Sequence, residues 1–298
     1  MAAPQPAARE ISANGVEFTV LEAGSGPLAL CLHGFPDSAH TWRRQLPAIA
    51  EAGFHAVAPF MRGYAPTAVP EDGCFSLGAL IADANALHEA FGADDQAVLI
   101  GTDWGAEAAY GAAAFAPGRW RRLVTLAIPP LTLDAKLFTD FDQLKRFFYM
   151  FLFTQPLAEE VVAADDMAFL DRLWEEWSPG YDSAEDLARV KDSLRERANL
   201  SAAIAYYRAA LGAPAESCAS FEAEQRALAE TPPQPTLYLH GARDGCIDVD
   251  LVRDADTQLS PGSRFSVVED AGHFLHLERP ELVTKEILGW VSRDRRRR

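Results

Sequence analysis

Cysteine is scarce in this chain, and basic residues are fewer than acidic ones. The 298 residues include 4 cysteines, at positions 31, 74, 218 and 246, and no two of them form a CxxC pair. This spacing indicates neither a zinc site nor a disulfide framework. The 27 Lys and Arg against 43 Asp and Glu give a formal net charge of −16. Such an acidic balance disfavours nucleic acid and anionic membranes as partners, because both repel a negative surface.

Long apolar segments are also missing. The longest apolar run, residues 147–153, is far too short to cross a bilayer. Residues 1–10 are rich in Ala and Pro, lack the apolar core of a signal peptide, and are expected to form a disordered lead-in. The four arginines at 295–298 are expected to be a frayed, solvated terminus. We therefore expect a cytoplasmic protein, either a monomer or a homodimer.

The apolar residues that are present form short buried segments alternating with helical patterns. A half-buried strand at 16–22 is expected to form a hairpin with 10–13 across Asn14-Gly15. Strands alternating with helices predict an α/β core, a mostly parallel sheet with helices on both faces. The remaining expected strands lie at 28–32, 55–58, 97–100, 123–128, 236–239 and 264–268, and the helices between them at 41–52, 77–91 and 106–115.

This alternation stops between residues 131 and 229. Only helical patterns occur there, at 141–153, 158–174, 183–197 and 201–211, before strand signals resume and a last helix follows at 281–291. We therefore predict one core domain made of residues 1–130 and 230–298. The segment 131–229 is predicted to be an inserted all-helical cap.

The sequence Gly-Thr-Asp-Trp-Gly at 101–105 directly follows an apolar strand and precedes a helix. A strand, a tight glycine turn and a helix form the nucleophile elbow of α/β-hydrolases, and here Asp103 stands at its apex instead of serine. A carboxylate is ionised at neutral pH and needs no base before it attacks an sp³ carbon and forms an alkyl ester. The elbow therefore indicates ring opening or halide displacement and disfavours serine esterase chemistry.

An alkyl ester on Asp103 must be hydrolysed, which requires a base and an acid that orients it. In this fold the chain order is nucleophile, acid, histidine, and Asp244 and His273 follow it, each just after an expected strand. We expect Asp244 to orient His273, which takes a proton from the attacking water. Asp248 is the competing acid. His276 is the competing histidine, and it is expected to pack in the next turn.

The negative oxygen that forms during ester hydrolysis needs backbone N–H donors. In this fold they belong to the residue after the nucleophile and to a residue on the loop after an early strand. These positions are Trp104 and, in the sequence His-Gly-Phe-Pro at 33–36, Phe35. We therefore predict an oxyanion hole formed by Phe35 and Trp104.

Four motifs make the chain similar to the epoxide hydrolases of the α/β-hydrolase superfamily: 33–36, Arg-Gly-Tyr at 62–64, 101–105, and Ala-Gly-His at 271–273. The resemblance covers nearly the whole chain and implies that Asp103, Asp244 and His273 open epoxides to vicinal diols. Haloalkane dehalogenases also resemble the chain in the Asp-Trp pair, but they usually place Asn or Glu where Phe35 stands. Fluoroacetate dehalogenases share the motif at 33–36, but they follow the nucleophile with arginine.

The resemblance also implies two tyrosines on the cap that protonate the leaving alkoxide, since phenols with a pKa near 10 donate without prior ionisation. Tyr207 matches the Tyr-Arg pattern of the family. The position expected for the second phenol is occupied by Leu152. Tyr149, one helical turn earlier, is the nearest phenol. It is either the second donor or an aromatic of the cap core, and Tyr206 is expected to be a cap-core aromatic as well.

Large aromatic side chains are the candidates for an apolar pocket that excludes water, although each is also a candidate for the core. The expected substrates are a small apolar epoxide and water, with no cofactor and no metal. A haloalkane dehalogenase and a non-catalytic ligand-binding protein of the same fold are the alternatives. The pocket candidates are Phe35, Trp42, Trp104, Phe148, Phe151 and Trp177.

Overall fold

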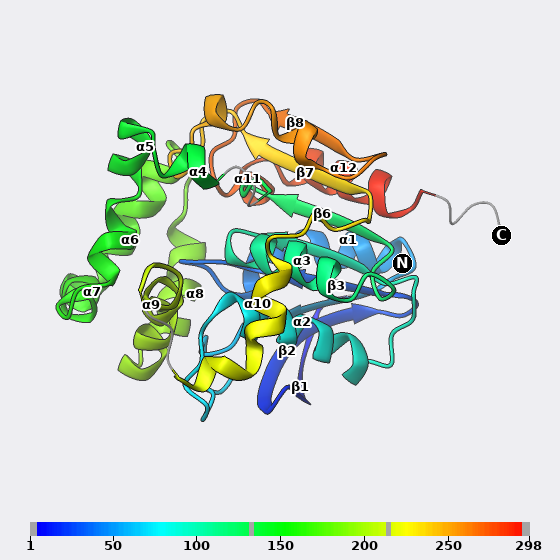
Figure 1. Ribbon diagram of the computed structural model, residues 1–298, viewed down its shortest axis with the longest axis horizontal. Helices are drawn as coiled ribbons and strands as arrows, with labels where there is room; N and C mark the ends of the chain where they lie inside the picture. Colours follow the sequence, from blue (N-terminus) through cyan, green and yellow to red (C-terminus); the bar gives the residue numbers. More distant parts are fainter. Residues whose placement is uncertain (1–4, 131–133, 213–215, 294–298) are drawn as a thin grey trace.

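A single eight-stranded sheet lies at the centre of the molecule (Figure 1). The computed structural model describes residues 5–130, 134–212 and 216–293. The strand order is β1-β2-β4-β3-β5-β6-β7-β8, in which β2 pairs antiparallel with β1 and β4 and the other pairs are parallel. This confirms the predicted α/β-hydrolase architecture. The strands are β1 Ala7–Ala13, β2 Val16–Gly24, β3 Leu28–Leu32, β4 His55–Pro59, β5 Val98–Thr102, β6 Arg122–Leu126, β7 Thr236–Gly241 and β8 Arg264–Val268.

The first strand begins earlier than the sequence predicted. β1 starts at Ala7, which pairs with Glu22, and the hairpin turns at Asn14 and Gly15, both with positive φ. The expected disordered lead-in is therefore wrong for residues 7–10, while residues 1–4 lie outside the described part. The edge of β2 offers unpaired backbone groups, and pairing with them orders residues whose side chains stay mostly exposed.

Helices cover both faces of the sheet. α2 and α3 pack against each other on one face, and α1 contacts α12 on the other (Figure 1). α2 begins after Ser76, whose hydroxyl accepts the N–H of Ala79, and α12 begins with a proline, which suits the first helical position. The bounds are η1 Ala39–Arg43, α1 Gln45–Glu51, α2 Leu77–Ala90, α3 Trp104–Phe115, η4 Val249–Leu251, η5 Ala255–Gln258, α11 Leu275–Glu278 and α12 Pro280–Val291.

Between β6 and β7 the described chain is helical. The helices α5 to α9 lie beyond the carboxyl ends of β6 and β7 (Figure 1), and we call α4 to α9 the helical insertion. η3 and α10, in contrast, pack on α2, and α10 also contacts α3. The bounds are α4 Asp134–Leu137, α5 Phe141–Arg146, α6 Phe148–Phe153, α7 Ala158–Trp177, α8 Ala184–Leu194, α9 Arg197–Leu211, η3 Glu216–Phe221 and α10 Glu222–Ala227.

Two differences from the expected helices concern the stretch from α5 to α7. The helix expected at 141–153 is split at Phe147, which ends α5 and precedes α6. α7 continues to Trp177, three residues beyond its expected end, and its backbone leaves the helical conformation at 164–167. The extension of α7 matters for the site because it brings Trp177 against the loops after β7 and β8.

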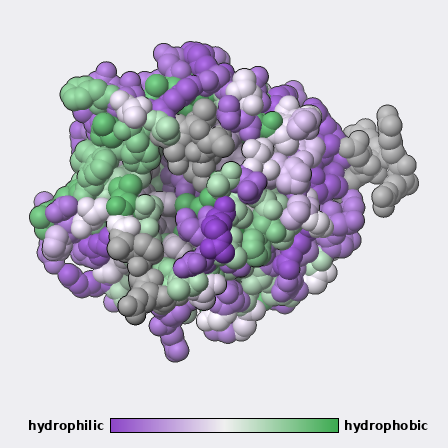
Figure 2. Space-filling model, in the orientation of Figure 1, coloured by the Kyte–Doolittle hydropathy of each residue, from purple (hydrophilic) through white to green (hydrophobic). Residues whose placement is uncertain are grey.

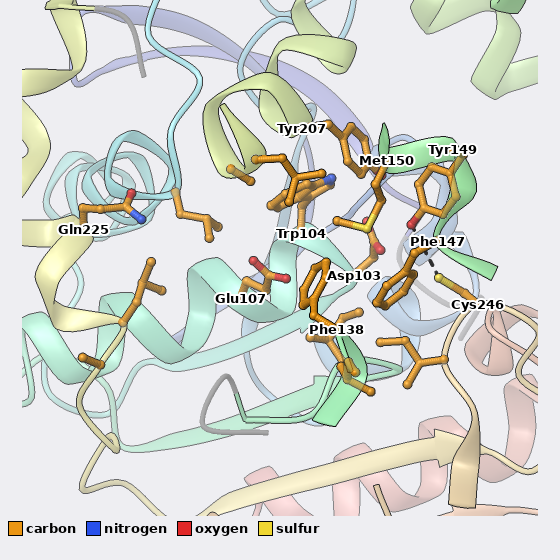
Figure 3. Close-up of a pocket in the computed structure, with 18 of the residues that line it drawn as sticks. Asp103, Trp104, Glu107, Phe138, Phe147, Tyr149, Met150, Tyr207, Gln225 and Cys246 are labelled. Atoms are coloured by element: carbon orange, nitrogen blue, oxygen red, sulfur yellow. Dashed lines mark hydrogen bonds between the residues drawn. The ribbon is translucent and has the colours of Figure 1, made fainter. Parts of the chain in front are cut away.

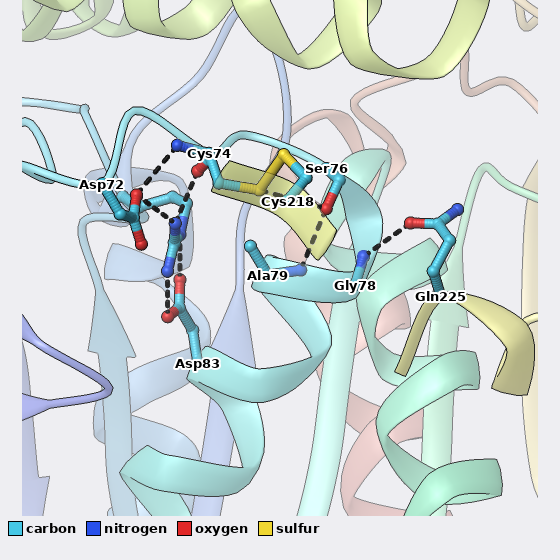
Figure 4. The surroundings of a disulfide bond; sticks show 9 residues. Asp72, Cys74, Ser76, Gly78, Ala79, Asp83, Cys218 and Gln225 are labelled. Carbon is cyan, nitrogen blue, oxygen red and sulfur yellow. Dashed lines mark hydrogen bonds and ion pairs between the residues drawn. A yellow bond between two sulfur atoms is a disulfide. The ribbon is translucent and has the colours of Figure 1, made fainter. Parts of the chain in front are cut away.

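A disulfide joins Cys74, in the loop before α2, to Cys218 in η3, with their Cα atoms 5.2 Å apart (Figure 4). The expectation that no disulfide is indicated is therefore wrong. The partners are 144 residues apart in sequence, and no spacing rule relates them. They meet because η3 folds back onto α2. Cys31 and Cys246 are free and buried.

The surface is mainly polar on the face seen in Figure 2, and apolar side chains gather over the helical insertion. The exposed large apolar residues of α5 and α6 contribute to this surface. No helix built from the described residues combines the length and the apolar character that crossing a membrane requires. The exposed apolar residues near α5 and α6 are Phe141, Phe148, Phe151 and Leu157.

Candidate active site

Asp103 stands at the tip of the turn between β5 and α3. Its φ of 51° and ψ of −128° are rarely adopted by residues other than glycine, so the turn holds a strained backbone. The turn is also very tight, because a Cβ atom at Gly101 would lie only 2.1 Å from the carbonyl oxygen of Gly105. The predicted elbow is thus present in the structure, with a carboxylate at its apex.

The two carboxylate oxygens of Asp103 have different neighbours. Oδ1 accepts the backbone N–H of Phe35 at 2.7 Å. Oδ2 lies 3.6 Å from Nε2 of His273, which is an ion-pair distance and longer than a hydrogen bond. The residue is buried, with 7% of its surface exposed. One oxygen is therefore fixed by the backbone of the loop after β3, and the other faces the histidine.

Asp244 and His273 come from the loops after β7 and β8. His273 Nδ1 lies 3.0 Å from Asp244 Oδ2, and Asp244 Oδ1 accepts the N–H groups of Cys246 and Ile247 at 2.7 and 3.0 Å. We call Asp103, His273 and Asp244 the Asp–His–Asp cluster. Parallel strands bring their carboxyl ends to one edge of the sheet, which is why residues far apart in sequence meet here.

The two competing residues lie elsewhere. Asp248 is partly exposed and accepts a hydrogen bond from Arg146 at 2.8 Å. His276 is buried, with Nε2 2.6 Å from the hydroxyl of Thr41 and its ring stacked on Trp42. The structure therefore brings Asp244 and His273 to Asp103, and it leaves Asp248 and His276 outside the cluster.

The charges of the cluster favour a protonated histidine in the resting protein. Burial alone lowers the pKa of His273, but the negative charges of Asp244 and Asp103 outweigh it and raise this pKa to about 10. For Asp244, burial raises the pKa, but the neighbouring His273 outweighs burial and the pKa ends below its usual value. A cationic imidazole between two carboxylates is the expected state at neutral pH.

Two phenols share a cavity of about 500 Å³ with Asp103 (Figure 3). Tyr149 is on α6 and Tyr207 on α9, and their ring centroids are 5.5 Å apart. The Tyr149 hydroxyl lies 3.7 Å from Cys246 Sγ, whereas the Tyr207 hydroxyl, which has the Trp104 indole as a polar neighbour, makes no hydrogen bond of normal geometry among the described residues. Burial raises the pKa of both phenols well above 10, so both are neutral proton donors.

Neither the residue at the position expected for the second phenol nor Tyr206, expected in the cap core, lines this cavity. Leu152, at the expected position, does not line it. Tyr206 donates its hydroxyl to the backbone oxygen of Arg62 at 2.9 Å. Arg62 is itself fully buried and pairs with Asp83. In the cavity, the structure therefore places Tyr149 next to Tyr207, whereas Leu152 and Tyr206 lie outside it.

Most of the predicted pocket aromatics have other positions. Trp42 is a correction: its ring stacks on that of His276 in the core, because η1 packs against α11. Phe148 and Phe151 are also corrections, since they are 45% and 46% exposed on the outer side of α6. Trp177 does not line the cavity but packs behind it. Of the pocket aromatics, Trp104 lines the cavity, and the Phe35 ring contacts Tyr207 with centroids 5.3 Å apart.

Sequence reasoning missed several residues that line the cavity. Glu107 lies one helical turn after Asp103 and carries a carboxylate into the cavity, and Cys246 lies two residues after Asp244 (Figure 3). The helical repeat after the elbow is a signal that could have found Glu107. No group of three or more His, Cys, Asp or Glu side chains suited to a metal occurs in the described ranges. Other lining residues are Ile128, Leu137, Phe138, Phe147 and Met150, with Gln225 and Arg226 on α10.

Comparisons with known proteins agree with this fold. A family model described as alpha/beta hydrolase fold matches residues 27–280. An "Epoxide hydrolase" of Caballeronia sordidicola is 32% identical, with 79% of this chain and 78% of the relative covered. "Epoxide hydrolase A" of Mycobacterium tuberculosis is 28% identical, with 96% and 98% covered. The crystal structure of Epoxide Hydrolase A from Mycobacterium thermoresistibile has 26% identity and a TM-score of 0.77, with 96% and 98% covered.

The sheet, the elbow and the matched family model define an α/β hydrolase. The chain belongs to the α/β-hydrolase family. Within that family it is an epoxide hydrolase-like enzyme, similar over 79% and 96% of its length to two relatives that carry that name.

Proposed function

We propose that this enzyme opens epoxides to vicinal diols through a covalent ester on Asp103. The observation that carries the proposal is the shared cavity in which Asp103 faces Tyr149 and Tyr207. An epoxide needs a nucleophile on one side and a proton donor for the oxygen that leaves on the other. The segment 131–229 would then act as a cap, since α6 and α9 supply the two phenols.

In the first step Oδ2 of Asp103 attacks a ring carbon, while Oδ1 stays on the Phe35 N–H. The carbon–oxygen bond of the ring breaks, and its electron pair goes to the ring oxygen. A hydroxyl proton from Tyr207 or Tyr149 neutralises this oxygen, because the raised pKa of both phenols keeps them protonated until the alkoxide forms.

In the second step the alkyl ester is hydrolysed. Esterification removes the negative charge of Asp103, which is one of the two charges that raise the pKa of His273. His273 then loses its proton more readily; this proton returns to the tyrosinate left by the first step, and the neutral imidazole becomes the base for a water molecule. The hydroxide attacks Cγ of Asp103, and the N–H groups of Phe35 and Trp104 stabilise the oxyanion. As the intermediate collapses, protonated His273 gives its proton to the departing alkoxide, which forms the diol, and the acid left on Asp103 returns its proton to His273.

Haloalkane dehalogenation is the second candidate because it uses the same nucleophile. The buried indole N–H of Trp104 makes no hydrogen bond of normal geometry among the described residues and could meet a halide. The Phe35 side chain offers no second donor, whereas the two phenols suit an alkoxide. Halide release from a panel of haloalkanes would favour this alternative, and diol formation from epoxides favours the proposal.

The covalent step is tested by incubating His273→Gln with styrene oxide and measuring the mass of the intact protein. Alkylation of Asp103 survives and hydrolysis stalls, so we expect an adduct of one substrate mass. Multiple turnovers of the unaltered enzyme in heavy-oxygen water should also label Asp103. Diol formation without adduct or label would overturn the proposal.

A further inference from the structure

The carboxyl end of α7 contacts both loops that carry the Asp–His–Asp cluster. The carbonyl oxygen of Trp177 accepts the N–H of Gly245 at 3.1 Å and that of His273 at 2.9 Å. Gly245 directly follows Asp244, and a Cβ atom there would lie 1.9 Å from the carbonyl oxygen of Glu176. One residue of the helical insertion is thus hydrogen-bonded to the acid loop and to the histidine itself.

The next residue, Ser178, extends this contact. Its buried hydroxyl accepts the N–H of Phe274 at 3.0 Å and donates to Oε1 of Glu278 at 2.7 Å. The carboxylate of Glu278 in turn accepts the N–H of Gly272, which is 2.9 Å from both oxygens. Ser178 and Glu278 therefore hold the backbone on both sides of His273.

The indole of Trp177 lies between the base and a phenol. Its ring centroid is 4.9 Å from that of His273 and 5.1 Å from that of Tyr149. The end of α7 therefore contacts the site in two ways. The carbonyl oxygen of Trp177 binds the backbone of the histidine loop, and its indole packs against the rings of His273 and Tyr149.

We propose that Ser178 and Glu278 are positioning residues for His273 and act on the hydrolytic half of the reaction. This inference rests on the proposed function. The attack by Asp103 needs no base, and its carboxylate is fixed independently by the elbow and by Phe35. Hydrolysis, in contrast, needs Nε2 of His273 aimed at a water molecule, and small errors in such an aim are costly.

The test separates the two half-reactions in Ser178→Ala, Glu278→Gln and Glu278→Ala. Single-turnover mixing with styrene oxide, followed by quenching and mass measurement of the intact protein, gives the rates of ester formation and ester decay. We expect ester decay to slow about ten-fold and ester formation to change less than about two-fold. Glu278→Gln should be milder than Glu278→Ala, since Gln keeps an acceptor for the N–H of Gly272.

The matched controls are Glu281→Gln, an exposed acid in the first turn of α12, and Ser183→Ala, at the start of α8. Both should leave the two rates unchanged. Equal slowing of both half-reactions, or normal ester decay in the Glu278 variants, would overturn the positioning role. If Ser178→Ala does not fold, the Glu278 pair decides alone. Absence of any ester in His273→Gln would instead reject the proposed function.

Discussion

The two sides of the cavity around Asp103 are held in different ways. On the sheet side, Asp244 and His273 are fixed by hydrogen bonds, including backbone N–H groups on both loops. On the side of the helical insertion, Tyr149 and Tyr207 are fixed by ring contacts, and the Tyr207 hydroxyl makes no hydrogen bond of normal geometry in the described chain. This difference matches the proposed roles. His273, as the base, must point at a water molecule, whereas Tyr207, as the donor, must keep its hydroxyl proton available for the substrate.

The two sides of the cavity also differ in charge. His273 is charged at rest because two carboxylates raise its pKa, whereas the phenols are neutral because burial raises theirs. A buried charge without partners costs more free energy than a buried neutral hydroxyl without partners. The variants that follow change Asp103, the phenol side, the disulfide and the sheet side in turn.

Removal of the carboxylate shared by both sides should have the largest effect. Asp103→Ala is expected to lower kcat/KM at least about 10⁴-fold, because no ester forms. The matched control is Glu107→Ala, which removes another carboxylate from the same cavity. Steady-state diol formation measures both. A loss in Glu107→Ala as large as that in Asp103→Ala would contradict the assignment of the nucleophile.

The phenol side should respond next. Tyr207→Phe is expected to slow ester formation about 100-fold, because the alkoxide loses a proton donor. Tyr206→Phe, its neighbour on α9, should change this rate less than about three-fold, since its hydroxyl is bound to the Arg62 carbonyl. Tyr149→Phe is expected to fall between them. Rapid-quench rates of ester formation decide the order, and equal effects of the Tyr206 and Tyr207 changes would refute it.

Breaking the disulfide should affect stability more than chemistry. The double change Cys74→Ser and Cys218→Ser opens a link between residues 144 positions apart. The free energy of unfolding is expected to fall by about 2–4 kcal/mol, because the unfolded chain gains freedom. Denaturant unfolding measures this loss. The rate of ester formation should stay within about two-fold, and a larger drop would show that η3 and α10 control the phenol side.

The raised pKa of His273, on the sheet side, predicts that stability depends on pH. Because the folded pKa of His273 is about 10 and the usual value is 6.5, folding takes up a proton between these values. The stabilisation is complete below about pH 6.5 and is lost as pH rises through about 10, on the order of 5 kcal/mol. Urea unfolding at pH 6, 8 and 10 should show this slope in the unaltered enzyme and in His276→Gln. The slope should be absent from His273→Gln, and its persistence there would assign it to another group.

Local patterns were sufficient for the fold and for the three residues of the Asp–His–Asp cluster. The elbow at 101–105 fixes its own geometry, since strand, glycine turn and helix are adjacent in sequence. Asp244 and His273 could be chosen because parallel strands deliver the residues after them to one edge. The choice between Leu152 and Tyr149 could not be settled in this way, because one helical turn decides which side chain reaches the cavity.

The sequence alone determined the strands, the elbow and the carboxylate at its apex, because each depends on residues that are neighbours in the chain. The order of the strands in the sheet was decided by the tertiary structure. Only the tertiary structure decided which aromatics line the cavity, that Cys74 meets Cys218, and that Trp177 and Ser178 support His273. These contacts join segments that are far apart in sequence. Which segments meet depends on how whole helices pack, and no local sequence pattern records this.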